Sequence, residues 1–197
     1  MNRRDILKSS ALFLGYAVSA TALSATFMAC SQEAKLDWNP LFLSNNQAAS
    51  IAEITETILP KTKTPGAKEL GVPQFIDKML KDLLSPEEQK DFLAGLEKLE
   101  EECERAYSKS FVECTPQQRQ EFLTKMDTEA AKLPPSVWGI RLAPPSPTPF
   151  FRRVKELTLL GYFTSQKIGK EVLGYDPIPG AYIACMPLTE GMNAWNE

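Results

Sequence analysis

The 197-residue sequence contains no histidine. Histidine is the usual general base of enzymes, the commonest transition-metal ligand and the usual axial ligand of haem. Its absence excludes serine and cysteine catalytic triads, histidine-containing zinc sites and haem attachment through a CxxCH motif. The ten glycines form neither a GxGxxG nor a GxxxxGK[ST] pattern, so a dinucleotide fingerprint and a P-loop are also missing. We therefore expect this chain to bind no cofactor and no metal.

No run of basic residues could follow a nucleic-acid backbone. The 22 basic and 25 acidic residues are interspersed, so we expect no nucleic-acid partner. An apolar fraction of 43% and a charged fraction of 24% are typical of a globular protein, and the length suits one domain. An enzyme that uses the carboxylates Asp77, Glu171 or Asp176 is an alternative, but the sequence places no second catalytic group beside any of them.

The first 29 residues have the layout of an export signal. Arg3 and Arg4 are adjacent, Lys8 follows them, and no further charged residue occurs before Glu33. The paired arginines resemble the twin-arginine export motif, and the uncharged stretch is rich in serine, threonine and alanine. A transmembrane helix is the alternative interpretation, because a stretch of this length could span a bilayer. We expect residues 1–29 to be a twin-arginine signal peptide that directs the mature protein to the periplasm.

Cys30 ends the uncharged stretch in the sequence TFMAC, and polar residues follow it. This arrangement resembles a lipoprotein cleavage box, in which the cysteine becomes the lipidated first residue of the mature chain. Such a lipid would tether the protein to a membrane without spanning it. Simple cleavage near Ala29 is the alternative. Removal of residues 1–29, which hold three basic residues and one acidic residue, changes the net charge from −3 to −5, and residues 30–45 are expected to form a linker.

The remaining residues, 46–197, are expected to form one helical domain. Apolar residues recur with helical spacing in five segments, which are residues 44–60, 72–84, 85–107, 115–133 and 149–173. The third and fourth segments open with the capping-box pairs Ser85 with Glu88 and Thr115 with Gln118. The last segment is predicted to be the longest and most apolar helix, interrupted at Gly161. The sequence therefore predicts an all-α fold, a single bundle of about five helices.

Proline-rich connectors and an irregular C-terminal segment interrupt this helical pattern. Residues 134–149 hold six prolines together with Trp138, which indicates an extended arm that wraps the domain or contacts a partner. The final patterned stretch, GYDPIPGAYIAC at residues 174–185, can be neither a helix nor a central strand, because it has two prolines and two glycines in its first seven residues. We name residues 174–185 the C-terminal strap.

Three cysteines follow Cys30. Cys103 lies near the end of one predicted helix and Cys114 just before the next, so a disulfide between them is expected in an oxidising compartment. That pairing leaves Cys185, in the C-terminal strap, as a free thiol or as one half of an intermolecular bridge.

Two irregular stretches carry a family resemblance. ILPKTKTPGAKELGVPQFID (58–77) and GYFTSQKIGKEVLGYDPIPGAYIAC (161–185) resemble the two signature regions of the gluconate 2-dehydrogenase subunit 3 family, and the resemblance extends over residues 46–187. It implies the small, non-flavin subunit of a membrane-associated sugar or sugar-acid dehydrogenase. In such complexes a large flavoprotein of the glucose-methanol-choline type carries FAD, and a cytochrome c often accepts the electrons. The resemblance also implies that the small subunit's signal exports the large subunit.

The export signal supports the same hypothesis by an independent route. Twin-arginine export carries folded cargo, typically because a cofactor must be inserted first, yet this chain has no cofactor motif. A cofactor-bearing partner that travels on this signal resolves the conflict. We expect the partner interface to comprise Trp138, Tyr162, Tyr175, Asp176, Pro177, Pro179, Tyr182 and Cys185.

Two alternatives remain open at this stage. The C-terminal strap could pack on its own helical bundle and close the core instead of binding a partner. The whole chain could also be a stand-alone envelope lipoprotein that binds a small ligand or another envelope protein.

Overall fold

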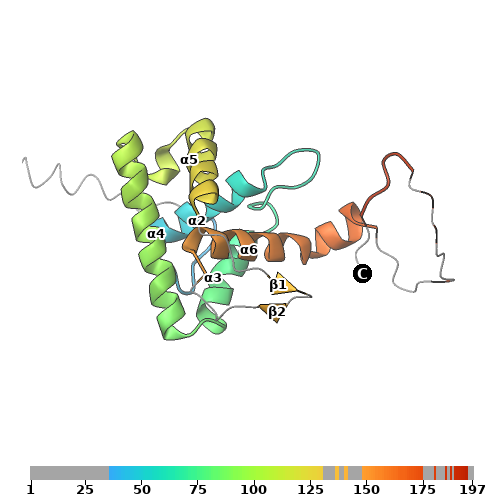
Figure 1. Cartoon of the computed structure of the whole chain (residues 1–197), viewed down its shortest axis with the longest axis horizontal. Helices are drawn as coiled ribbons and strands as arrows, with labels where there is room; N and C mark the ends of the chain where they lie inside the picture. Colours follow the sequence, from blue (N-terminus) through green and yellow to red (C-terminus); the bar gives the residue numbers. More distant parts are fainter. Residues whose placement is uncertain are drawn as a thin grey trace, which may run out of the picture. The chain divides into compact units, whose positions relative to one another are not determined.

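The computed structural model describes residues 36–130, 136–137, 140–141 and 148–174, together with 180, 185, 187 and 189–194. Within these residues the protein is an all-α bundle, as predicted (Figure 1). Its five α-helices are α2 (Asn45–Ile58), α3 (Val72–Asp82), α4 (Pro86–Tyr107), α5 (Pro116–Glu129) and α6 (Phe150–Phe163). A 3₁₀ turn, η1 (Phe111–Glu113), precedes α5, and a π-helical turn, η2 (Ile168–Val172), follows α6.

The proline-rich connector between α5 and α6 contains a small hairpin that the sequence did not predict. Its two strands are β1 (Ser136–Val137) and β2 (Ile140–Arg141), and they pair in antiparallel fashion, Val137 opposite Ile140. Among the helices that the structure describes, none combines the length and the apolar composition that a membrane span requires.

Local capping sequences explain where the helices begin. Ser85 accepts the backbone N–H of Glu88 while the Glu88 carboxylate accepts the N–H of Ser85, so the capping box predicted for α4 is confirmed. Thr115 and Gln118 form the box predicted for α5. These reciprocal bonds satisfy N–H groups that have no partner within the helix, which fixes the first turn.

Helix α2 lies at the centre of the bundle and contacts α3, α5 and α6. Its side chains Ile51 and Ile54 are fully buried, and they join a single apolar cluster with Ile76 of α3 and Leu96 of α4. Helix α6 packs across α3, α2 and α4, as Figure 1 shows for the orange helix. Burial of one stripe from each helix is what holds the bundle together.

The structure corrects the prediction for residues 149–173. Helix α6 is not interrupted at Gly161 but continues to Phe163 and is capped by Thr164, after which η2 begins. The longest helix is α4, with 22 residues. Gly161 is buried, and a Cβ at this position would lie 2.6 Å from Cδ1 of Phe75. The glycine therefore allows α3 to approach α6 closely, and helix propensity alone could not reveal this role.

The folded domain also begins earlier than the linker prediction for residues 30–45 implied. Leu43 is buried in the core, and the backbone N–H groups of residues 41–43 bond to Asp77 of α3. The segment before α2 is thus part of the bundle.

Candidate partner-binding surface

Helix α6 is apolar on two sides. One side is buried in the core and includes Phe151, Val154, Leu157 and Tyr162. The other side carries Leu159, Leu160 and Phe163, whose exposed fractions are 36%, 46% and 47%. Residues at i, i+1 and i+4 share one side of a helix, so these three side chains form one patch. We name Leu159, Leu160 and Phe163 the α6 apolar face.

The C-terminal strap follows α6 and η2 in the sequence. Helix α6 is followed by η2, and the N–H of Gly174, at the start of the strap, donates to the carbonyl of Ala194 at 2.6 Å. Ala194 therefore lies beside the end of η2. Cys185 within the strap is exposed and is a free thiol. An exposed apolar helix face is typical of a protein-binding surface.

The two stretches that carry the family resemblance contact each other. Tyr162 on α6 donates from its hydroxyl to the carbonyl of Pro65 at 3.0 Å, across 97 residues of sequence. Glu69, in the same connector between α2 and α3, forms ion pairs with Lys61 at 2.8 Å and with Lys167, just before η2, at 3.0 Å. Residues 58–77 and the α6–η2 region are thus one packed unit.

Glu56 fixes the connector from the other side. Its carboxylate accepts the backbone N–H of Lys61 at 3.0 Å and that of Lys68 at 2.9 Å. Gly66 lies so close to this carboxylate that a Cβ would overlap both of its oxygens. The glycine, the carboxylate and the ion pairs together hold the connector against α2 and α6, which explains the irregular composition of the first resembling stretch.

Tyr162 was expected at the partner interface, but the structure places it in the interior of the bundle. Its ring is buried and meets Phe163 edge-on with the centroids 5.3 Å apart, while its hydroxyl bonds to Pro65. Because ring and hydroxyl both have partners within the chain, we do not include Tyr162 in the proposed interface.

The remaining predicted site residues fall into two groups. Cys185 is described and exposed, as noted above. Outside the described residues lie Arg3, Arg4, Cys30, Trp138, Tyr175, Asp176, Pro177, Pro179 and Tyr182. Their roles in export, lipidation and partner binding stay predictions.

The sequence did not identify the α6 apolar face. Apolar residues crowd the C-terminal half of α6, which holds Leu157, Leu159, Leu160, Tyr162 and Phe163, so periodicity could not show which of them face outward. The excess of apolar residues was the available signal, since one helix rarely buries two sides in a small bundle.

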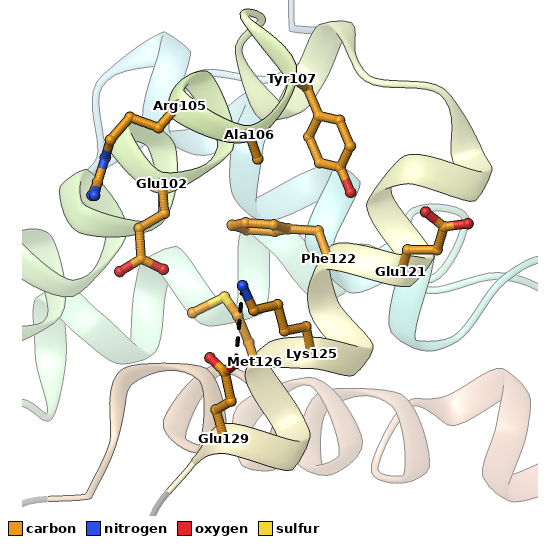
Figure 2. A pocket seen from close by; sticks show the side chains of 9 residues that line it. All are labelled: Glu102, Arg105, Ala106, Tyr107, Glu121, Phe122, Lys125, Met126 and Glu129. Carbon is orange, nitrogen blue, oxygen red and sulfur yellow. Dashed lines mark ion pairs between the residues drawn. The ribbon is translucent and has the colours of Figure 1, made fainter.

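A cleft of 570 Å³ opens between α4 and α5 (Figure 2). Ala106, Tyr107, Phe122 and Met126 form its apolar part, whereas charged side chains of both signs surround it: Glu102, Arg105, Glu121, Lys125 and Glu129. Burial, with the nearby Glu121 carboxylate, raises the pKa of Tyr107. Its phenol therefore stays protonated at neutral pH and cannot act as a base there. None of the site residues predicted from sequence lines this cleft.

Of the three candidate catalytic carboxylates, the structure describes Asp77 and Glu171, and Asp176 lies outside the described residues. Asp77 is 1% exposed and accepts three backbone N–H groups, which is a structural role. Glu171 is exposed at η2. Over the described ranges, no three cysteine, aspartate or glutamate side chains gather closely enough to hold a metal ion.

Cys103 and Cys114 are brought together as the sequence predicted, but as two thiols. Both are buried, and their sulfur atoms lie 3.5 Å apart. Burial and the neighbouring Cys114 raise the pKa of the Cys103 thiol to about 12.

The described part of the chain is thus an all-α domain with an exposed apolar helix face. Comparison with known families assigns the chain more closely. The family described as Gluconate 2-dehydrogenase subunit 3 matches residues 45–180, which is more than two thirds of the sequence. The chain belongs to this family, so the resemblance noted in the sequence is confirmed. No curated protein and no solved structure matches it significantly.

Family membership indicates an accessory subunit of a multi-subunit dehydrogenase complex. The two irregular stretches, 58–77 and 161–185, both contribute to the matched region. The contacts of Tyr162 and Glu69 show that these stretches are neighbours in space as well.

Proposed function

We propose that this protein is the non-catalytic small subunit of an exported, flavin-dependent sugar or sugar-acid dehydrogenase. It binds a large subunit of the glucose-methanol-choline type that carries FAD, and it escorts that folded subunit through twin-arginine export. A cytochrome c accepts the electrons from the assembled complex. The observation that carries the proposal is the family match over residues 45–180.

The proposed binding surface combines the α6 apolar face with the C-terminal strap. Leu160 and Phe163 expose nearly half of their surface on a helix that is already packed on its other side. Burying such side chains against a partner is favourable by about 25 cal/mol for each Å² of apolar surface. The strap begins at Gly174, whose N–H donates to the carbonyl of Ala194 just after η2.

The export role rests on the N-terminal sequence. Arg3 and Arg4 are adjacent in a signal-like segment, and twin-arginine export carries proteins that are already folded. A chain without a cofactor motif gains from this route when its partner must receive FAD before export. The mature complex resides in the periplasm, held at the membrane through a lipid on Cys30 or through its other subunits.

The test is isolation of the protein from its native envelope with an internal tag. The turn at residues 108–110 suits the tag because it is exposed and leaves both chain ends free. We expect a yellow complex that shows flavin absorbance and contains a large flavoprotein. A folded, colourless single chain, purified under gentle conditions, would contradict the proposal and favour the stand-alone lipoprotein.

A matched signal variant separates the export route from complex formation. Replacing Arg3 and Arg4 by lysine keeps the positive charge but removes the paired arginines. We expect this variant to leave both subunits in the cytoplasm as a yellow complex. Unchanged export of the variant would indicate the general secretory route instead.

A further inference from the structure

Cys103 and Cys114 face each other at the junction of α4, η1 and α5. Cys103 lies one turn before the end of α4, and Cys114 is the residue that caps η1 just before α5. The exposed fractions of the two residues are 0% and 4%, and their sulfur atoms are 3.5 Å apart. A disulfide bond is about 2.05 Å long, so the sulfurs need to approach by only about 1.5 Å.

Polar contacts hold the backbone segments around Cys103 and Cys114 in this position without a disulfide bond. Glu100 on α4 accepts the backbone N–H of Phe111 at 3.0 Å, which fixes the start of η1. Arg119 on α5 donates to the carbonyl of Phe111 at 3.1 Å and also bonds to Val112 and to Glu53 of α2. The segment between the cysteines is therefore anchored to both helices, and it holds the two sulfur atoms within 3.5 Å of each other.

We propose that Cys103 and Cys114 form an intrachain disulfide in the exported protein, by exchange with the disulfide of an envelope oxidant. The location rests on the export step of the proposed function, whereas the pairing rests on geometry alone. Cys114 loses its proton and attacks one sulfur of the oxidant, which gives a mixed disulfide. Cys103 then loses its proton and attacks the sulfur of Cys114, which releases the oxidant as a dithiol. The chain thus gives up two electrons and two protons, and the oxidant takes up both.

The order of attack follows from accessibility. Cys103 is fully buried and burial raises its pKa to about 12, so its thiolate is scarce in the folded protein. Cys114 lies in the two-residue connection between η1 and α5, where a local opening exposes it without unfolding either helix. If the protein is exported in the folded state, Cys103 and Cys114 cross the membrane as thiols. The envelope oxidant then converts them to the disulfide.

The disulfide joins α4 to the connection that leads into α5, and α4 and α5 form the walls of the cleft in Figure 2. Cys103 immediately follows Glu102, and Phe122 in the cleft packs against Phe111 with the ring centroids 6.3 Å apart. The bond therefore attaches the segment before α5 to α4 in the mature protein.

The test equilibrates the purified full chain in glutathione buffers of defined redox potential, followed by acid quenching. Free thiols are alkylated under denaturing conditions, and peptides are identified by mass spectrometry. We expect a linked peptide pair containing Cys103 and Cys114 in oxidising buffer, and a free, alkylated Cys185. Cys185→Ser is the control and leaves the linked pair unchanged. Alkylation of both Cys103 and Cys114 in the most oxidising buffer would overturn the proposal.

The same peptide analysis on cell fractions distinguishes failure of the pairing from failure of export. The wild-type chain from the envelope is expected to contain the bond, whereas the variant with Arg3 and Arg4 replaced by lysine, held in the cytoplasm, is expected to contain two thiols. A reduced pair in the envelope chain would overturn the disulfide even if export is confirmed. A wild-type chain found only in the cytoplasm would contradict export, and the buffer titration would still decide the pairing.

Thermal melting supplies a readout that needs no substitution. The bond closes a loop of about a dozen residues, so the oxidised chain is expected to melt roughly 5–10 °C above the reduced chain. Cys114→Ala removes the pair, and its melting temperature should not respond to reductant. Equal melting temperatures of linked and reduced wild-type chains would show that the bond does not clamp the helices.

Discussion

The Asp77 carboxylate on α3 accepts the backbone N–H of Leu43 at 2.8 Å, which joins α3 to the segment that leads into α2. The same carboxylate accepts the N–H groups of Leu41 at 2.6 Å and of Phe42 at 3.1 Å. Three N–H donors compensate for the burial of the negative charge. Asp77, a catalytic candidate from the sequence, therefore connects α3 to the segment before α2 through hydrogen bonds.

Replacing Asp77 by asparagine is expected to lower the free energy of unfolding by about 3 kcal/mol. The asparagine amide keeps one acceptor oxygen but turns an NH₂ group toward N–H donors, which leaves buried groups unsatisfied. Urea unfolding measures the change. Asp82→Asn, at an exposed position of the same helix, is the control and should change the free energy by less than about 0.5 kcal/mol. Equal effects of the two substitutions would contradict the structural role of Asp77.

Gly161→Ala is expected to destabilise the protein by about 1–2 kcal/mol, although alanine is the better helix former. The added Cβ would lie 2.6 Å from the Phe75 ring, so α3 and α6 must move apart. Gly180→Ala is the control, because a Cβ there meets no described atom within 4 Å. Urea unfolding of both variants is the measurement. A stabilised Gly161→Ala variant would show that α3 and α6 do not pack this closely.

Tyr162→Phe should lower the free energy of unfolding by about 1 kcal/mol, because the carbonyl of Pro65 loses its donor. Partner binding by this variant is expected to be unchanged, since the ring remains buried. Urea unfolding and co-purification with the large subunit measure the two properties separately. Loss of the partner without loss of stability would return Tyr162 to the interface.

Leu160→Asp is expected to abolish co-purification of the large subunit while leaving the melting temperature within about 2 °C of the wild type. The substitution places a charge in the α6 apolar face, whose side chains are already in contact with water. Leu83→Asp is the matched control, because Leu83 is an exposed leucine at the end of α3. A variant at Leu160 that still binds the partner would remove the α6 apolar face from the proposed interface.

Acidification is expected to loosen the connector between α2 and α3. Hydrogen bonds from Lys61 and Lys167 hold the pKa of Glu69 below its ordinary value of 4.5. A carboxyl whose pKa is lowered by folding stabilises the protein above its unfolded-state pKa, and this contribution is lost as the pH falls through the folded-state pKa. The effect therefore appears below about pH 4.5.

Melting temperatures recorded between about pH 6 and pH 3 test this behaviour. Glu69→Gln should melt lower than the wild type near neutral pH, and the difference should shrink on acidification. Glu156→Gln, at an exposed position of α6, controls for the loss of one negative charge. A constant difference between Glu69→Gln and the wild type across the range would contradict the role of the two ion pairs.

The starts of helices were predictable because the responsible groups are close in sequence. Ser85 with Glu88 and Thr115 with Gln118 are three residues apart, so each capping box is visible in a short stretch. The juxtaposition of Cys103 and Cys114 was predictable for a similar reason, since only a short turn separates their helices.

The end of α6 and its two faces were not predictable in the same way. Apolar residues recur with helical spacing on both sides of Thr164, as far as Leu173, so periodicity gave no reason to end the helix at Phe163. Which leucines face the core depends on how α6 packs on α3 and α2, and no local rule contains that information.

The sequence by itself determined the all-α class, the helix starts and, through two irregular stretches, the family. Those features depend on local hydrogen bonding and on residue patterns that can be recognised from neighbouring positions in the sequence. Only the tertiary structure decided that Asp77 ties α3 to the start of α2, that Tyr162 is interior, and that Leu160 is exposed. Each of these outcomes depends on burial or on contacts between residues far apart in the chain, and packing in three dimensions is what sets them.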